Sequence, residues 1–145
     1  LSAPKLPFVI GIMGIDGLKG DTKAPMMNFR AAQRQPTMLD EFKGNVFAVE
    51  TARFWDDDLE ALVERKERLD DTLEQSFRKA KPTPTEPEKE AAREKALERE
   101  FMPDELRRLN VGVSNGGYHY LGAAKIIAPI GQAFAETLVG SPAGK

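Results

Sequence analysis

The chain of 145 residues contains no cysteine and a single histidine. The lack of cysteine excludes disulfides, zinc sites with thiolate ligands and a cysteine nucleophile. An excess of positive charge is also lacking, because 21 basic and 23 acidic residues give a net charge of −2. Such a chain has no basic field to attract a polyanion, and nucleic acid is therefore not expected as a partner.

Long apolar runs are missing as well. No run approaches the roughly 18 to 20 residues needed to cross a bilayer, so a membrane is not expected as a partner. The start, Leu1-Ser2-Ala3-Pro4-Lys5, has no signal-peptide pattern and no initiator methionine. It leads at once into an apolar segment, which is typical of an interior stretch. We therefore expect the chain to be part of a longer protein.

Two short apolar runs are present near the start of the chain. Pro7 to Met13 is apolar and β-branched and ends at a glycine, and Val46 to Val49 follows Gly44-Asn45. Between them, Lys23 to Gln35 is compatible with a helix that stops before Pro36. Strand, helix and strand with these spacings predict a βαβ unit in a parallel sheet, and hence an α/β fold.

The segment from Asp56 to Leu109 is strongly charged. It holds 29 of the 44 charged side chains, 12 basic and 17 acidic. Apolar residues recur at helical spacing from Leu59 to Phe77 and again from Ala92 to Leu109, with three prolines between the two stretches. The sequence predicts a helical hairpin over residues 56–109. Its thin apolar stripe indicates that it rests on the parent domain or on a partner.

The only histidine, His119, lies in the polar, glycine-containing stretch from Ser114 to Tyr120. An amphipathic stretch from Tyr120 to Val139 follows, in which Pro129 is expected to bend or break a helix. Open α/β folds place their chemistry in loops at the carboxyl edge of the sheet. An imidazole there could accept a proton from a serine hydroxyl during acyl transfer. On the residues alone, the alternative remains open that His119 is a non-catalytic histidine packed between two tyrosines.

Several blocks outside the charged segment resemble the C-terminal part of the sialate O-acetylesterase-like branch of the SGNH hydrolases. They are Leu6–Gly11, Phe29–Gln33, Gly44–Val46, Tyr118–Lys125 and Ile130–Ala135. The block from Tyr118 to Lys125 is the most specific of them. The resemblance implies that residues 1–145 form the C-terminal portion of a flavodoxin-like parallel-sheet hydrolase domain, with the hairpin as an insertion. It further implies an acetylated carbohydrate as substrate, and favours an extracellular or periplasmic location.

The resemblance also implies a role for His119, since the histidine of the last block is the general base in that family. The serine nucleophile and the oxyanion-hole residues come from earlier blocks that have no match here. The missing N-terminal part of the same domain is thus an expected partner, and the chain alone is expected to be inactive. The family commonly has an aspartate three residues before the histidine, where this chain has Gly116.

The acceptor that would orient the histidine therefore stays open. Four carboxylates follow the predicted strands and are candidates, although capping or surface solvation is the ordinary role of each. They are Asp16, Asp21, Glu50 and Asp56. A backbone carbonyl as the acceptor, or a serine and histidine pair without a third member, are the other possibilities.

Five residues are candidates for contact with a sugar substrate. Arg30 and Gln33 fall on one helical turn, Trp55 follows the second strand and could stack on a pyranose ring, and Asn115 and Tyr118 flank the histidine. Surface solvation is the alternative for Arg30 and Gln33, and anchoring of the hairpin is the alternative for Trp55.

No metal or other cofactor is expected. Asp56-Asp57-Asp58 at a helix start complements the helix dipole, and the glycines between Gly11 and Gly17 lack the spacing of a dinucleotide site. The sequence thus predicts a carbohydrate O-acetylesterase to which this chain supplies the base. The alternative is a non-catalytic binding or assembly module, built on a degenerate hydrolase fold, whose hairpin recruits a partner.

Overall fold

The computed structural model describes residues 6–140, so the start of the chain lies outside the described residues. The described residues divide into two compact units, one of residues 6–56 and 115–140 and the other of residues 57–114. Helices predominate, and the described strands form one two-stranded parallel sheet. The expected α/β character is therefore confirmed.

The first unit is built around a βαβ element. Strand β1 spans Phe8–Ile12, helix α1 spans Ala24–Arg34 and strand β2 spans Val46–Glu50. The two strands pair in parallel, in a register that runs from Phe8 opposite Val46 to Ile12 opposite Glu50. This confirms the predicted order of strand, helix and strand, including a first helix that ends before Pro36.

Short 3₁₀ helices connect these elements. They are η1 (Gly17–Thr22), η2 (Gln35–Met38), η3 (Asp40–Phe42) and η4 (Thr51–Phe54). The strands are parallel, so η1 and η4 both leave the sheet at its carboxyl edge. A fifth 3₁₀ segment, η5 (Gly117–Gly122), precedes the last helix.

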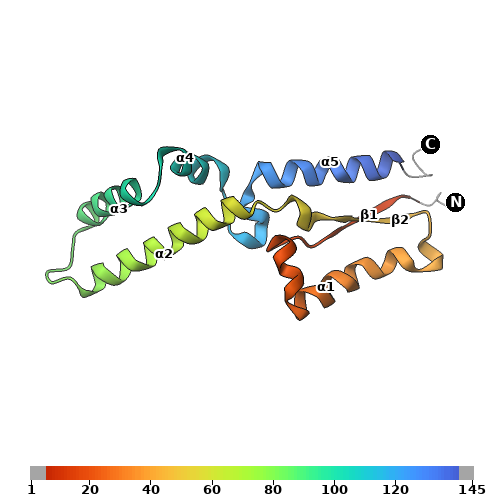
Figure 1. The fold of residues 1–145 in the computed structure, drawn as a ribbon, viewed down its shortest axis with the longest axis horizontal. Helices are drawn as coiled ribbons and strands as arrows, with labels where there is room; N and C mark the ends of the chain where they lie inside the picture. Colours follow the sequence, from red (N-terminus) through yellow and green to blue (C-terminus); the bar gives the residue numbers. More distant parts are fainter. Residues whose placement is uncertain (1–5, 141–145) are drawn as a thin grey trace. The chain divides into compact units, whose positions relative to one another are not determined.

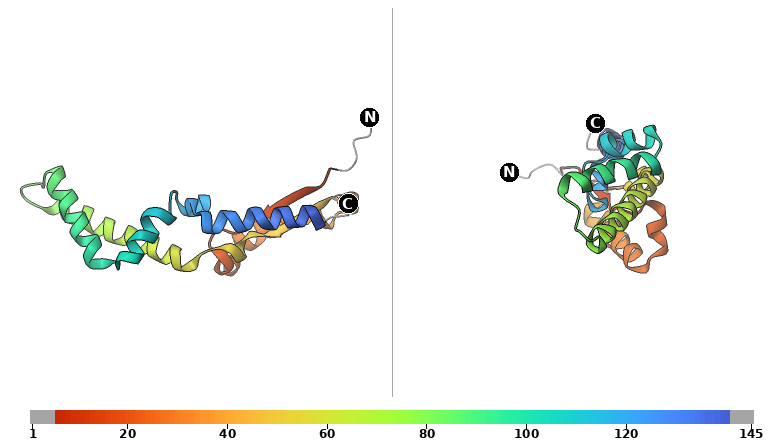
Figure 2. Two further views of the ribbon diagram at one scale, coloured as in Figure 1. Left: turned by 90° about the horizontal axis from the view of Figure 1, so that it is seen from above. Right: turned by 90° about the vertical axis from the view of Figure 1, so that its left-hand side faces the viewer.

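Helix α5 (Ala124–Gly140) lies over one face of the sheet and α1 lies under the other (Figures 1 and 2). Ile126 is completely buried in this unit, together with Ile12 and Leu121. Of the two outcomes predicted for Pro129, a bend or a break, the break is wrong, because α5 continues through the proline. Ile126 and Ala133 are buried on either side of it, and this packing offsets the loss of one helical hydrogen bond.

The second unit consists of three helices (Figure 1). They are α2 (Asp57–Lys79), α3 (Glu86–Glu100) and α4 (Pro103–Gly112). The single helix predicted up to Leu109 is divided at Met102, because a residue before proline is disfavoured in helical geometry. The Glu105 carboxylate accepts the Met102 backbone N–H at 2.8 Å and caps the new helix.

The second unit has an apolar core of its own. Leu62, Phe101 and Leu109 are buried together, and other apolar side chains of α2, α3 and α4 pack against them. The Arg65 guanidinium lies 4.2 Å above the Phe101 ring, where it covers the core and interacts with the π face. The sequence did not predict this core, because its thin apolar stripes indicated helices that rest on the parent domain or on a partner. No helix within residues 6–140 has the length and apolar character of a membrane span.

Candidate functional site

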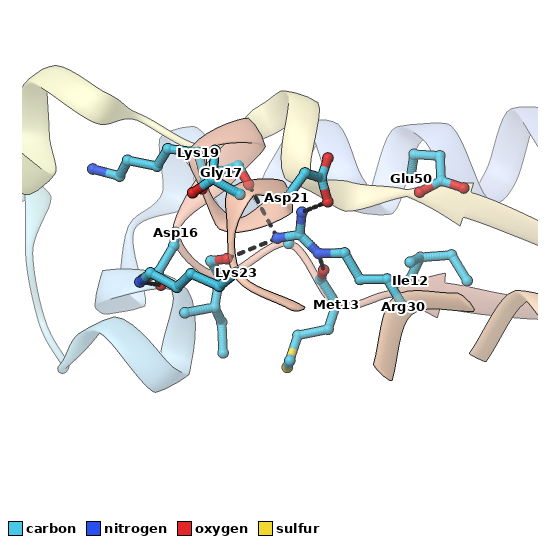
Figure 3. Close-up of polar contacts among 12 residues, drawn as sticks. Ile12, Met13, Asp16, Gly17, Lys19, Asp21, Lys23, Arg30 and Glu50 are labelled. Carbon is cyan, nitrogen blue, oxygen red and sulfur yellow. Dashed lines mark hydrogen bonds and ion pairs between the residues drawn. The ribbon is translucent and has the colours of Figure 1, made fainter. Parts of the chain in front are cut away.

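Arg30 organises the loop that follows β1. Its side chain is only 4% exposed although it lies on α1, whose apolar residues Met27 and Phe29 are half exposed. The guanidinium donates to the backbone carbonyls of Met13, Ile15 and Gly17 at 2.7 to 3.0 Å. It also donates to the Asp21 carboxylate at 2.6 Å (Figure 3). Four hydrogen bonds from one planar group thus hold an otherwise irregular loop.

Two residues of this loop have a left-handed backbone, Asp16 with φ of 64° and Gly17 with φ of 56°. Any side chain at Gly17 would also press on Trp55, since a Cβ there would lie 3.0 Å from the ring. Trp55 is buried and meets Tyr120 edge to face, with ring centroids 6.0 Å apart. The loop after β1, the segment η4 and the segment η5 are therefore packed on one another.

Tyr120 ties η5 to the carboxyl edge of the sheet. Its phenolic oxygen accepts the Gly14 backbone N–H at 2.9 Å and lies 2.9 Å from Thr51 Oγ1. Thr51 Oγ1 in turn donates to the Ile12 carbonyl at 2.7 Å. Gly14 and Thr51 lie just beyond the ends of β1 and β2. The histidine segment thus lies at the edge of the sheet at which the sequence predicted it.

His119 lies within η5 with its side chain exposed. Its backbone N–H donates to the Gly116 carbonyl at 3.0 Å. Within residues 6–140 the imidazole itself has no hydrogen-bond or ion-pair partner. The ring is therefore accessible, and no described side chain orients it.

A pocket of about 270 Å³ lies beside this segment. It is lined by Met13, Ile15, Asp16, Met26, Gly117 and Tyr118. The residues come from the loop after β1, from α1 and from η5, and they present mostly apolar surface with one carboxylate. Since Tyr118 directly precedes His119, the pocket and the imidazole belong to the same short segment.

The structure gives Arg30 and Gln33 a different role from the sugar contact that the sequence suggested. The Arg30 guanidinium is occupied by the loop, and Gln33 Oε1 accepts the Met13 backbone N–H at 2.8 Å. Both side chains turn toward the end of β1 and position the pocket-lining residue Met13. Neither side chain lines the pocket, but both hold a residue that does.

The other three candidates for sugar contact each lie in different surroundings. Trp55 is 8% exposed and packed against Gly17 and Tyr120, so its ring has little surface for a sugar. Asn115 is exposed, and its Oδ1 accepts the Gly116 backbone N–H at 2.8 Å. Tyr118 is 86% exposed and lines the pocket. The structure brings only Tyr118 together with the pocket.

Each of the four candidate orienting carboxylates is paired with a cationic side chain. The pairs are Asp16 with Lys23 at 2.7 Å, and Asp21 with Arg30, Glu50 with Arg34 and Asp56 with Lys125 at 2.6 Å each. Asp56 is the most buried of them, at 8% exposure. None of the four forms a hydrogen bond or ion pair with His119 among the residues that the structure describes.

The sequence did not single out Thr51 or Tyr120 as important. Tyr118 and Tyr120 lie on either side of the histidine in the sequence. In the structure the backbone of η5 is left-handed at Tyr120, whose side chain points to the sheet edge, while the Tyr118 side chain is exposed. A glycine following Leu121 was the one available signal of that turn.

In the part of the chain that the structure describes, no group of three or more histidine, aspartate or glutamate side chains could hold a metal ion. No protein-family model, curated protein or solved structure matches the chain.

Proposed function

We propose that this chain is the C-terminal portion of a flavodoxin-like SGNH hydrolase domain and supplies the general base of a carbohydrate O-acetylesterase. One observation carries the proposal: the exposed His119 follows a pocket-lining residue at the carboxyl edge of two parallel strands. Open α/β sheets bind ligands at that edge. The pocket of about 270 Å³ is near the lower end of the range of small-ligand sites, roughly 300 to 1,000 Å³.

In the proposed reaction a serine from the missing N-terminal part attacks the acetyl carbonyl. His119 accepts the hydroxyl proton and passes it to the sugar oxygen as the carbon–oxygen ester bond breaks. The imidazole then takes a proton from water as the water oxygen attacks the acyl-serine. It gives this proton to the serine oxygen as the acyl carbon–oxygen bond breaks, which regenerates the serine hydroxyl and releases acetic acid. Backbone N–H groups stabilise the oxyanion at each step.

The group that orients the base is part of this proposal. Asp16, Asp21, Glu50 and Asp56 are engaged with cations, and Gly116 offers no side chain. On this proposal the acceptor is a carboxylate or a backbone carbonyl from elsewhere, such as the missing N-terminal part, or serine and histidine act as a pair.

The open edge of β1 suits the missing part as a partner. Both strands are almost entirely apolar, which is typical of strands buried on both faces of a larger parallel sheet, yet Phe8 is 59% exposed. The Phe8 N–H donates to the Asn45 carbonyl, and alternation along the strand directs the N–H groups of Val9 and Gly11 away from β2. A strand of the missing part would pair at this edge.

Acetate release from acetylated sugars or p-nitrophenyl acetate tests the proposal. The full-length protein should hydrolyse the ester, and His119→Ala should lower kcat by at least about 10³-fold, as expected for loss of the base in a hydrolytic triad. Gln132→Ala is the control, because Gln132 lies exposed on α5 and pairs only with Glu136 among the residues described. Equal rates for wild type and His119→Ala would rule out the assignment.

A binding or assembly module is the second candidate. The ion pairing of all four candidate carboxylates favours it, as does the separate core of the charged unit. Replacement of residues 57–114 by a glycine–serine linker discriminates between the two. If the variant no longer binds its partner but still hydrolyses the ester, these helices serve in recognition. If it no longer hydrolyses the ester, they form a lid or wall of the active site.

A further inference from the structure

The hydroxyl of Tyr120 lies in a directional chain of hydrogen bonds. Thr51 has one hydroxyl proton, and it is donated to the Ile12 carbonyl, which can only accept. Thr51 Oγ1 must then accept from Tyr120, and the Tyr120 oxygen accepts from the Gly14 N–H. The chain therefore starts at the Gly14 amide, passes through two side chains and returns to the backbone at Ile12.

Two members of this chain of hydrogen bonds, Thr51 and Gly14, are buried. Thr51 is 2% exposed, so water does not replace a lost hydrogen bond there. Gly14 is buried as well, and a Cβ on it would lie 2.4 Å from the Ala52 nitrogen. The Tyr120 hydroxyl therefore lies between the Gly14 backbone and the Thr51 side chain, in contact with both.

The backbone of η5 is strained around the same residue. Tyr120, Leu121 and Gly122 have consecutive positive φ values of 53°, 58° and 58°, and the first two are not glycine. Such a conformation persists only where the surroundings enforce it. Here Leu121 is buried and hydrogen bonded at both ends, from its N–H to the Gly116 carbonyl and from the Asn115 N–H to its own carbonyl.

We propose that Tyr120 is the positioning residue for His119: its hydroxyl, inserted between Gly14 and Thr51, holds the strained η5 backbone that presents the imidazole at the carboxyl edge of the sheet. His119 precedes Tyr120 directly, and its own N–H is held by Gly116 on the other side. The backbone that carries the base is therefore held on both sides, although no described side chain orients the ring. The catalytic part of this inference rests on the proposed function, whereas the structural part does not.

For the measurement of backbone order, the two tyrosines provide a matched pair of variants. Tyr120→Phe removes the hydroxyl from the chain of hydrogen bonds, and Tyr118→Phe removes a hydroxyl from a side chain that is 86% exposed. Thr51→Val removes the acceptor of Tyr120, and Thr51→Ser keeps it. Circular dichroism of each variant verifies that the chain is folded, and Thr51→Val remains informative if Tyr120→Phe does not fold.

The first measurement is the ¹⁵N order parameter of residues 117–121 in the 145-residue chain. We expect about 0.85 in the wild type, Tyr118→Phe and Thr51→Ser, and below about 0.6 in Tyr120→Phe and Thr51→Val. Unchanged order parameters in Tyr120→Phe would overturn the inference, whatever the activity of the protein.

The second measurement is ester hydrolysis by the full-length protein. Tyr120→Phe should lower kcat on the order of 10²-fold, as expected for a displaced catalytic group, with KM for the ester unchanged. A disordered segment with unchanged kcat would overturn the positioning role. If the wild type does not hydrolyse esters, the proposed function fails, and the order parameters still decide whether Tyr120 holds His119.

Discussion

Arg30 is a charged residue that occupies a core position of α1. Its guanidinium donates hydrogen bonds to the carbonyls of Met13, Ile15 and Gly17 in place of water. These carbonyls need such a donor because the loop has no regular backbone hydrogen bonding. Arginine suits this position because its donors form a rigid planar fork, whereas lysine offers a single point charge. The candidate pocket therefore depends on a residue that does not line it.

Arg30→Ala should lower the free energy of unfolding by about 3 kcal/mol or more, because three shielded carbonyls lose their donor at roughly 1 to 3 kcal/mol each. Arg34→Ala is the matched control on the same helix. Its side chain is 38% exposed and pairs with Glu50, so the loss should stay below about 1 kcal/mol. Urea unfolding followed by the fluorescence of Trp55, the single tryptophan, measures both. Equal losses would contradict the role assigned to Arg30.

Two glycines give opposite predictions for the same substitution. At Gly14 a Cβ would lie 2.4 Å from the Ala52 nitrogen and 2.5 Å from Thr51 Oγ1, so Gly14→Ala should cost about 1 to 3 kcal/mol through overpacking. Gly131 lies inside α5 with nothing near its Cβ position, so Gly131→Ala should stabilise by about 0.5 to 1 kcal/mol. Thermal unfolding separates the two, and a Gly14→Ala protein as stable as wild type would refute the packing described.

At the scale of elements, sequence patterns predicted what depends on local chemistry. Apolar runs ending at glycine gave β1, and Pro36 set the end of α1. The division between α3 and α4 was missed, although Pro103 and Glu105 carry its signal. The turn of η5 had almost no signal, because two non-glycine residues take a left-handed backbone only under tertiary constraint. Likewise, helical spacing placed Arg30 and Gln33 together but could not reveal the carbonyls they meet.

The helix starts of the second unit predict a dependence on pH. Hydrogen bonds from the Thr85 backbone N–H and hydroxyl hold the pKa of Glu88 below its ordinary value of 4.5. The Met102 backbone N–H and Arg65 lower the pKa of Glu105 in the same way. A carboxyl with a lowered pKa in the folded state stabilises it above the unfolded value, near pH 4.5. The contribution is lost as pH falls through the folded pKa.

Carboxyl ¹³C NMR titration checks this directly. Glu88 and Glu105 should titrate with midpoints below 4.5, and Thr85→Ala should move the Glu88 midpoint upward because one of its two donors is removed. Glu105 in the Thr85→Ala protein is the internal control, since its donors are Met102 and Arg65. A Glu88 midpoint at or above 4.5 in the wild type would contradict the capping arrangement.

At the scale of the whole molecule, the two units differ in how their apolar residues are covered. The charged unit closes its apolar residues into a core covered by Arg65. The first unit instead has central-type strands in a sheet of two, and a pair of parallel strands is marginal without further strands or covering layers. α1 and α5 cover the faces of this sheet (Figure 1), and on the function proposed above its edges are the surfaces on which more of the domain assembles.

Proline at two successive positions of β1 tests that assembly. Val9→Pro removes an N–H that faces the open edge, and proline is tolerated at such edge positions, so the 145-residue chain should keep its fold. Ile10→Pro removes an N–H that faces β2 and should unfold the βαβ unit.

On the proposal that the missing part adds a strand at this edge, Val9→Pro should abolish ester hydrolysis by the full-length protein while the 145-residue chain remains folded. Circular dichroism of the chain and acetate release by the full-length protein measure the two effects separately. Full activity of Val9→Pro would contradict the extension of the sheet at β1, because a third strand there would lose a ladder hydrogen bond and meet the proline ring.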